Sequence, residues 1–311
     1  MSKLTKIYLI TGFLGSGKTT FLQKQLEQQS HKVGVLMNEF GKTSIDGTLV
    51  EEQDMDMIEL TNGSIFCSCL KDHFIEGLKE LISRNLDCIY IESSGLADPS
   101  NMVTIVDLLR KQCRYNFTYI GAICMVDCLH FFKEYEMLVS VGNQIRHSQI
   151  IILNKVDLVE PSRLNEIKEL INQLNQKAYL IETTYGNITI DQLSFKAESM
   201  QKPSETSNTT SNRPRTITIT VKESNIEIND IITLLKRIKS HCYRIKGLLT
   251  MGDRTYKLDA VQDKLEISEY SKDVGKHHQL VLISSIGTKL IRIIQEEMPK
   301  ALVGQININI E

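Results

Sequence analysis

The sequence lacks several features that would identify whole classes of protein. Its 36 basic and 38 acidic residues leave a formal net charge of -2, so there is no basic excess with which to attract nucleic acid. No apolar stretch approaches the roughly 18 residues that a membrane-spanning helix needs. The N-terminus enters an apolar run almost at once, which leaves no room for a secretory signal. We therefore expect a cytoplasmic protein that binds neither nucleic acid nor membranes.

Cysteine is present in an odd number, seven, and only Cys67 and Cys69 lie close together. This pattern does not suggest a disulfide framework and indicates reduced thiols in the cytosol. With 311 residues, of which 41% are hydrophobic and 24% charged, the chain is long enough for two ordinary globular domains.

The most informative segment that is present is GFLGSGKT, residues 12–19, directly after the apolar run at 6–11. It matches the phosphate-binding pattern G-x-x-x-x-G-K-[ST], with a predicted strand before it and a predicted helix at 20–29 after it. Glycines let the backbone curl around a triphosphate, and the helix N-terminus adds its positive dipole end. The predicted nucleotide ligands are Gly12, Gly15, Ser16, Gly17, Lys18, Thr19 and Thr20. Lys18 would reach the β- and γ-phosphates, and the Thr19 hydroxyl would bind Mg²⁺.

Strand-like runs recur after this loop, with helical patterns between several of them. They cover residues 32–37, 57–61, 87–93, 118–126, 149–154 and 177–182. Most are rich in Ile, Val, Leu and Cys, as strands covered on both faces should be. Strands that alternate with helices predict a doubly wound, mostly parallel α/β domain, which we place at residues 1–199.

The composition changes after this domain. Residues 200–215 are rich in Ser, Thr, Asn and Pro and predict a flexible linker. A strand at 216–222, a long helix at 228–241, several strands between 245 and 284 and a final helix at 287–297 then predict a small α+β domain. We expect this domain to span residues 216–311 and to contain an antiparallel sheet.

NKVD, residues 154–157, follows the apolar strand IIIL and predicts a guanine-binding element. The Asp157 carboxylate can accept hydrogen bonds from N1–H and N2–H₂ of guanine, whereas adenine offers an acceptor at N1. The stem of Lys155 can cover the base plane, and Asn154 can brace the loop. The alternative is an aspartate that caps a helix after a strand.

IESSGLADP, residues 91–99, follows another apolar strand. An acidic residue at such a strand end, followed by a glycine, suggests that Glu92 holds Mg²⁺ through water and that the Gly95 N–H senses the γ-phosphate. The alternative for Glu92 is a solvent-facing side chain.

Glu39 and Asp46 lie between the phosphate-binding loop and the segment 91–99. Either carboxylate could approach Mg²⁺ or the attacking water, although Asp46 precedes a glycine and also fits a simple turn.

With GFLGSGKTT, NEFG, IDG, ELTNG, ESSGLADP, MVD and NKVDLV in this order, the chain resembles the CobW-like GTPases, relatives of the UreG and HypB metallochaperones. The resemblance implies GTP and GDP as ligands and GTP hydrolysis coupled to handling of a transition metal, most often zinc. It extends over the whole chain, because the C-terminal half with RIKG at 244–247 looks like the family's second domain. It also makes a nucleotide-dependent homodimer plausible.

The metal signature departs from the family pattern. Where the family has C-x-C-C after the ELxNG strand, this chain has Gly63-Ser64-Ile65-Phe66-Cys67, and a further cysteine follows at Cys69. A tetrahedral zinc site needs three or four ligands, so Cys67 and Cys69 can share a metal only with help from elsewhere. The alternative is a pair of reduced cysteines in a loop.

Three functions remain open from the sequence. The first is a Mg²⁺-dependent GTPase with slow intrinsic turnover that delivers a transition metal, zinc in the first instance, to a client protein. The second is a regulatory GTPase that acts through a protein partner without metal cargo. The third is a metal-binding protein with an inert nucleotide site, against which the intact nucleotide motifs argue.

Overall fold

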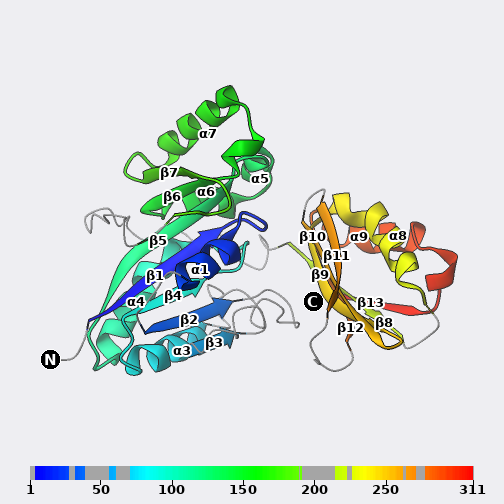
Figure 1. Ribbon diagram of the computed structural model, residues 1–311, viewed down its shortest axis with the longest axis horizontal. Helices are drawn as coiled ribbons and strands as arrows, with labels where there is room; N and C mark the ends of the chain where they lie inside the picture. Colours follow the sequence, from blue (N-terminus) through cyan, green and yellow to red (C-terminus); the bar gives the residue numbers. More distant parts are fainter. Residues whose placement is uncertain are drawn as a thin grey trace. The chain divides into compact units, whose positions relative to one another are not determined.

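The computed structural model of the chain describes residues 4–27, 32–38, 56–60, 71–188, 190, 214–222, 226–261, 264–270 and 277–310. The described residues up to Ile190 belong to one compact unit, and those from Pro214 onward belong to a second. Each unit has its own sheet and its own hydrophobic core (Figure 1).

The first unit contains a seven-stranded sheet in the order β3-β2-β4-β1-β5-β6-β7, and every neighbouring pair is parallel. The strands are β1 (Thr5–Gly12), β2 (Val33–Asn38), β3 (Asp56–Leu60), β4 (Cys88–Glu92), β5 (Phe117–Asp127), β6 (Ile150–Asn154) and β7 (Tyr179–Thr183). β4 and β6 are buried along their whole length, which explains their nearly continuous apolar sequences.

Helices cover both faces of this sheet. They are α1 (Lys18–Glu27), α3 (Lys71–Ser83), α4 (Met102–Gln112), α5 (Phe131–Met137), α6 (Val139–Arg146) and α7 (Pro161–Leu174). Phe21 and Leu22 of α1 pack on one face, while Leu78 of α3 and Ile105 of α4 pack on the other. Apolar residues three and four apart give α4 one buried side, as an amphipathic helix requires, whereas α6 is buried at six consecutive positions, 140–145.

The parallel register brings distant motifs to one edge of the sheet. Ile10 of β1 pairs with Glu92 of β4, and Gly12 pairs with Met125 of β5. Asp127 of β5 pairs with Asn154 of β6. Since the carboxyl ends of parallel strands meet at the same edge, the phosphate-binding loop and the segments after β4, β5 and β6 lie together there.

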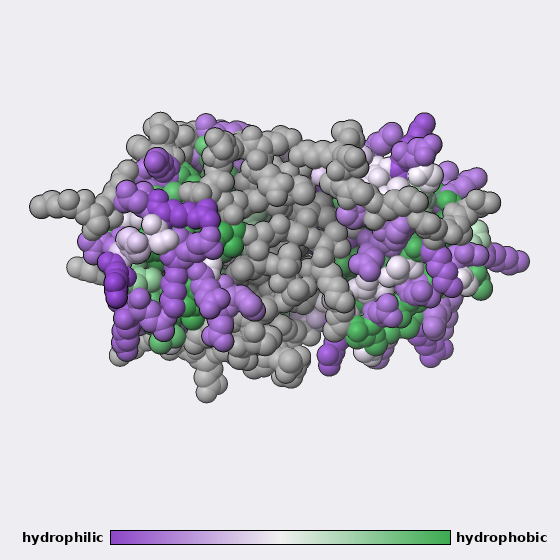
Figure 2. Space-filling view, turned by 90° about the horizontal axis from the view of Figure 1, so that it is seen from below, coloured by the Kyte–Doolittle hydropathy of each residue, from purple (hydrophilic) through white to green (hydrophobic). Residues whose placement is uncertain are grey.

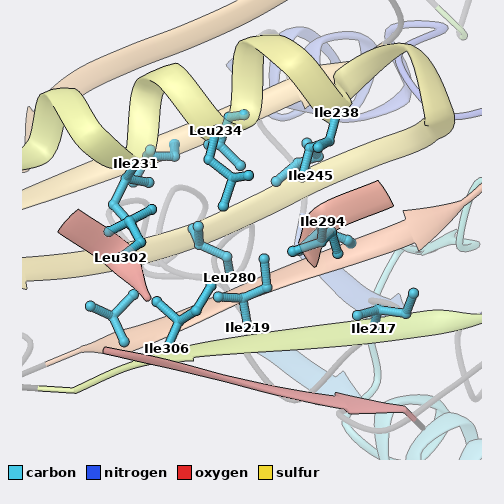
Figure 3. Packing of buried hydrophobic residues seen from close by; sticks show 14 of the residues in the cluster. Ile217, Ile219, Ile231, Leu234, Ile238, Ile245, Leu280, Ile294, Leu302 and Ile306 are labelled. Atoms are coloured by element: carbon cyan, nitrogen blue, oxygen red, sulfur yellow. The ribbon is translucent and has the colours of Figure 1, made fainter. Parts of the chain in front are cut away.

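The second unit contains a six-stranded antiparallel sheet in the order β11-β10-β9-β12-β8-β13. Its elements are β8 (Thr216–Val221), α8 (Ile228–Ile238), β9 (Cys242–Met251), β10 (Arg254–Val261), β11 (Lys264–Tyr270), β12 (His278–Ser284), α9 (Lys289–Glu296) and β13 (Ile306–Ile310). Ile217 and Ile219 of β8 point toward Ile231 and Leu234 of α8 and Ile294 of α9 (Figure 3). The isoleucines alternate with threonines along β8, so one face of the strand enters this core.

The predicted fold class is confirmed, with strand boundaries within two residues of those expected. Two details of the C-terminal prediction were wrong. The long helix ends at Ile238 and continues as a short 3-10 turn, Lys239–His241. The chain does not finish on the predicted last helix, because β13 follows it and pairs with β8. The predicted linker lies outside the described residues up to position 213.

The described surface is mixed in character. On the face seen in Figure 2, hydrophilic side chains cover most of the coloured surface and hydrophobic ones lie between them. None of the described helices combines the length and the apolar composition needed to cross a membrane.

Candidate functional site

The loop between β1 and α1 has a backbone that requires glycine. Gly12 and Gly17 have φ angles of +135° and +102°, which side-chain-bearing residues rarely adopt. A Cβ on Gly12 would lie 2.2 Å from the carbonyl oxygen of Met125 on β5. The loop is therefore fixed closely against the end of the neighbouring strand.

Lys18 begins α1 and is almost fully buried. Its Nζ donates to the carbonyl oxygens of Gly12, 3.0 Å away, and Phe13, 2.9 Å away. The ammonium thus lies inside the curve of the loop, where the glycines also converge. A cation held in this place can neutralise the charge of a bound phosphate group.

Thr19 and Glu92 meet at the same edge of the sheet. Thr19 Oγ1 donates to Glu92 Oε1 at 2.7 Å, and the Glu92 side chain is buried. Hydroxyl and carboxylate oxygens are the ligands that Mg²⁺ prefers. The residues present therefore fit Mg²⁺, and Glu92 is not the solvent-facing glutamate of the alternative interpretation.

Several buried hydroxyl groups surround this pair. The hydroxyls of Ser16, Ser93 and Ser94 have no hydrogen-bond partner within the described part of the chain. Buried polar groups normally have partners, so their accumulation here points to a polar ligand or water. Phosphate oxygens can accept from hydroxyl groups, so a phosphate group suits these surroundings.

Asn154, the first residue of NKVD, contacts both the phosphate-binding loop and the turn after β7. Its Nδ2 donates to the carbonyl oxygen of Ser16 at 2.8 Å, and its Oδ1 accepts from the N–H of Gly186 at 3.2 Å. A Cβ on Gly17 would lie 2.5 Å from Asn154 Nδ2, so the contact leaves no room for a side chain there. One amide thus joins the loop after β1 to the turn after β7.

Lys155 follows Asn154 in a left-handed conformation, with φ +63°. Its Nζ donates to Asp127 Oδ2 at 2.6 Å. His130 Nδ1 lies 3.2 Å from the same oxygen, and the N–H of Leu129 donates to Asp127 Oδ1 at 3.0 Å. Burial, the largest effect, raises the pKa of Asp127, but the hydrogen bonds and charges of His130 and Lys155 together hold that pKa below its ordinary value.

Two parts of this arrangement were not predicted from the sequence. Asp127 was not assigned to the site, although its place at the end of a predicted strand, in MVD, was a usable signal. Tyr185 and Gly186, in the turn after β7, were also missed; Tyr185 is 72% exposed and has a φ of +56°. Asp157 lies exposed on the short 3-10 helix Val156–Leu158, and Thr20 is exposed on α1.

Asp127, His130 and Glu134 place three possible metal-ligand atoms within 4.8 Å of one another. Both oxygens of Asp127 already accept hydrogen bonds, and one of them carries the Lys155 ammonium. We therefore interpret this group as a support for Lys155.

The predicted transition-metal ligands Cys67 and Cys69 lie outside the described residues, as do Glu39 and Asp46. Among the cysteines that are described, burial raises the pKa of Cys124, Cys128 and Cys242 to about 12. These three thiols are therefore protonated at neutral pH.

Comparisons with known proteins give a family match over the first unit. Residues 6–182 match the family described as CobW/HypB/UreG, nucleotide-binding domain. The zinc chaperone YjiA of Escherichia coli is 31% identical over 190 residues, covering 59% of this chain and 59% of that protein. The zinc-regulated GTPase metalloprotein activator 1 of Schizosaccharomyces pombe is 32% identical over 195 residues, covering 58% of this chain and 46% of that protein. The matched part thus spans about half the length of these relatives.

Among solved structures, the Zn(II)-bound YjiA GTPase from E. coli is similar to 98% of this chain and 99% of its own, with 21% identity and a TM-score of 0.48.

Proposed function

The chain belongs to the CobW/HypB/UreG family of nucleotide-binding domains, and we propose that it is a Mg²⁺-dependent GTPase that delivers zinc to client proteins. The observation that carries the GTPase assignment is the contact between Thr19 of the phosphate-binding loop and Glu92 of β4. It joins two oxygen ligands suited to Mg²⁺ beside a glycine loop that encloses a lysine ammonium.

In this proposal Lys18 and the loop N–H groups bind the β- and γ-phosphates, and Asp157 selects guanine. Bound Mg²⁺ would neutralise charge that develops on the phosphates, with Thr19 as a direct ligand and Glu92 as a ligand through water. Gly95 would contact the γ-phosphate, and Glu39 or Asp46 would orient the attacking water. This set of residues contains no arginine, so we expect slow intrinsic turnover.

The zinc assignment is supported by the names of the relatives, two of which are described through zinc. In this chain Cys67 and Cys69 are the proposed thiolate ligands, with further ligands needed to complete the coordination. Both cysteines follow the segment that contains Glu39 and Asp46 in the sequence. We expect γ-phosphate contacts to act on this segment and so to change the affinity for zinc.

We also propose the wider organisation. The GTPase domain would end near residue 199, and a linker at 200–215 would precede the C-terminal domain. The partner would be a metal-dependent client protein, and a homodimer would form in one nucleotide state. A cytoplasmic location suits the free thiols of the described cysteines.

GTP hydrolysis by the purified chain tests the nucleotide half of the proposal. We expect release of phosphate from GTP in Mg²⁺, little release from ATP, and loss of the activity in the Lys18→Ala variant. Equal rates with GTP and ATP, or an unchanged rate in Lys18→Ala, would contradict the assignment.

Zinc binding tests the other half. A chelator-competition titration should give one tight site per chain in the wild type and none in the Cys67→Ala/Cys69→Ala variant. Cys113→Ala serves as the matched control, because it also removes one free thiol. Binding that is weak, or that the double substitution leaves unchanged, would favour a regulatory GTPase whose cargo is a protein.

A further inference from the structure

The loop between β4 and the 3-10 helix Pro99–Asn101 is held from the side of the phosphate-binding loop. The N–H of Ser93 donates to the carbonyl oxygen of Ile10 at 2.9 Å, which extends the β1–β4 pairing past the end of the strand. Gly95 packs on Leu14 so closely that a Cβ would lie 2.6 Å from the Leu14 nitrogen. The loop therefore lies directly against the backbone that would surround the phosphates.

The same loop is held from α6 by two consecutive side chains. Gln144 Nε2 donates to the carbonyl oxygens of Gly95, at 3.2 Å, and Ala97, at 2.9 Å. Asn143 Nδ2 donates to Asp98 Oδ2 at 2.7 Å. Gln144, Asn143 and Asp98 are all buried, so water competes little for these bonds.

The hydrogen bonds within this loop determine the direction in which the Gly95 N–H points. The N–H of Ala97 donates to the carbonyl oxygen of Ser94 at 3.0 Å. That carbonyl and the Gly95 N–H belong to the same planar peptide unit and point in opposite directions. Rotation of this peptide would break the bond from Ala97, and Gln144 holds the carbonyls of two peptide units that follow, Gly95–Leu96 and Ala97–Asp98, which stabilises the turn in this arrangement.

The orientation of the Gln144 amide is itself determined by the network. If oxygen and nitrogen were exchanged, the oxygen would face two carbonyl acceptors and both bonds would be lost. As placed, Gln144 Oε1 has no hydrogen-bond partner within the described residues. An acceptor left without a partner in a buried position is a cost that functional sites commonly carry.

The end of α6 is fixed in turn. Asn175, just after α7, donates through Nδ2 to the carbonyl oxygens of Ile145, Arg146 and Ser148, at 2.9, 3.1 and 2.8 Å. These bonds hold the end of the helix that carries Gln144 against the segment after α7.

We propose that Gln144 is a positioning residue for GTP hydrolysis, which presets the Gly95 N–H toward the γ-phosphate before nucleotide binds. This inference rests on the proposed GTPase function and adds a residue that does not touch nucleotide. The expected effect is selective, because only GTP has a γ-phosphate that can accept a hydrogen bond from the Gly95 N–H. Loss of the Gln144 amide therefore acts on hydrolysis and on affinity for GTP, and spares affinity for GDP.

The test compares Gln144→Met, which has similar length and no amide, with Gln144→Glu, which places an oxygen against the two carbonyls. Gln149→Met is the matched control. Gln149 is also buried, and its Oε1 accepts from the N–H of Ala122 at 2.6 Å, in the β5 strand and away from the loop. The readouts are the single-turnover rate with GTP, the affinities for GDP and for a non-hydrolysable GTP analogue, and the melting temperature.

We expect both Gln144 variants to hydrolyse GTP about tenfold more slowly and to bind the GTP analogue more weakly, while GDP affinity stays within about twofold of wild type. Gln149→Met should keep the wild-type rate at a comparable melting temperature. An unchanged rate in a folded Gln144 variant, or parallel losses for GDP and GTP, would overturn the inference. Absence of hydrolysis in the wild type would instead refute the proposed function.

Discussion

At the scale of residues, the site is held together by short hydrogen bonds between different segments of the first unit. Thr19 meets Glu92, Asn154 meets the carbonyl of Ser16, and Lys155 meets Asp127. In each pair the two residues lie far apart in the sequence. Changes to one partner should therefore affect the site directly, and each variant also needs a stability measurement, because the partner that remains is buried.

Thr19→Ala should separate the Mg²⁺ contribution from the rest of nucleotide binding. The variant loses the hydroxyl that lies 2.7 Å from Glu92 and so one proposed direct ligand. We expect affinity for GDP in excess Mg²⁺ to fall about tenfold, close to the wild-type affinity measured with the metal chelated. Thr19→Ser keeps a hydroxyl and should bind nearly as the wild type does. Wild-type affinity and Mg²⁺ dependence in Thr19→Ala would show that the hydroxyl is not a ligand.

Asp157→Asn should change base selection. Asparagine offers an amide donor where the carboxylate accepts from guanine, and xanthine carries a carbonyl where guanine carries its amino group. We expect GTP affinity to fall on the order of 10²-fold and affinity for xanthosine triphosphate to rise, as measured by competition against a fluorescent nucleotide. A variant that still prefers GTP would remove Asp157 from the guanine site.

The spacing of the residues within the phosphate-binding loop and within NKVD is itself the chemical requirement, so the sequence alone suffices to propose them as nucleotide ligands. Asp127 and Gln144 could not be assigned in the same way. The position of Asp127 at the end of a predicted strand was a usable signal, but its contact with Lys155 and the contact of Gln144 with the loop after β4 depend on which elements lie side by side, and a pattern along the chain does not contain that information. Tyr185 and Gly186 also could not be assigned to the site from the sequence, because their place beside Asn154 depends on the fold.

At the scale of elements, the loop after β4 is fixed between the phosphate-binding loop and α6. Gly95 lies against Leu14 on one side, and Gln144 holds the loop on the other. Neither neighbour can move easily, because one precedes α1 and the other is within α6. Steric changes in this loop should therefore reach the nucleotide site directly.

Gly95→Ala tests this packing. The new Cβ would lie about as close as 2.5 Å to Leu14, so the loop or the phosphate-binding backbone must shift. Overpacking of this kind typically destabilises by about 1–3 kcal/mol, and here we also expect strong loss of GTP hydrolysis.

Gly252→Ala is the matched control for Gly95→Ala. Gly252 has a φ of +60° but open space around its Cβ position, in the turn between β9 and β10. We expect about 1 kcal/mol of destabilisation from backbone strain and an unchanged hydrolysis rate. Equal hydrolysis by the two variants would contradict the close approach at Gly95. Denaturant unfolding and phosphate release measure both effects.

His147, at the end of α6, makes the stability of the folded protein depend on pH. Burial, the main cause, lowers the pKa of His147; Asp98 opposes this change and Arg146 adds to it. The unfolded state therefore binds more protons in the window just below the ordinary pKa of about 6.5, and stability falls there as the pH falls.

The corresponding measurement is stability against pH for the wild type and for His147→Gln. We expect a shallower decline below about pH 6.5 in the variant, because the histidine proton no longer contributes. Identical slopes for the two proteins between neutral pH and pH 5 would rule out this contribution. His241 →Gln, at a 3-10 turn in the other unit, is a suitable control substitution.

Most elements could be predicted from hydrophobic patterns, because strands such as β4 and β6 are buried on both faces and helices such as α4 bury one side. β13 was missed for a physical reason. Its sequence ININI alternates, but the strand is short and only partly buried at the sheet edge, so its pairing with β8 provides the stabilisation.

The whole molecule consists of two units with separate hydrophobic cores. The first unit provides the nucleotide site, and the proposed zinc ligands Cys67 and Cys69 fall between β3 and α3 in the sequence. If the chain is a zinc-delivering GTPase, its nucleotide state and its zinc affinity must therefore be linked. By thermodynamic reciprocity, zinc must then also change the relative affinities for GTP and GDP.

The most direct test is the zinc affinity of the full chain loaded with GDP and with a non-hydrolysable GTP analogue, measured against a competing chelator. We expect the zinc affinities of the two nucleotide-bound forms to differ at least about fivefold, and we expect no such difference in Cys67→Ala/Cys69→Ala. Equal zinc affinity in the two nucleotide forms would contradict the proposed linkage.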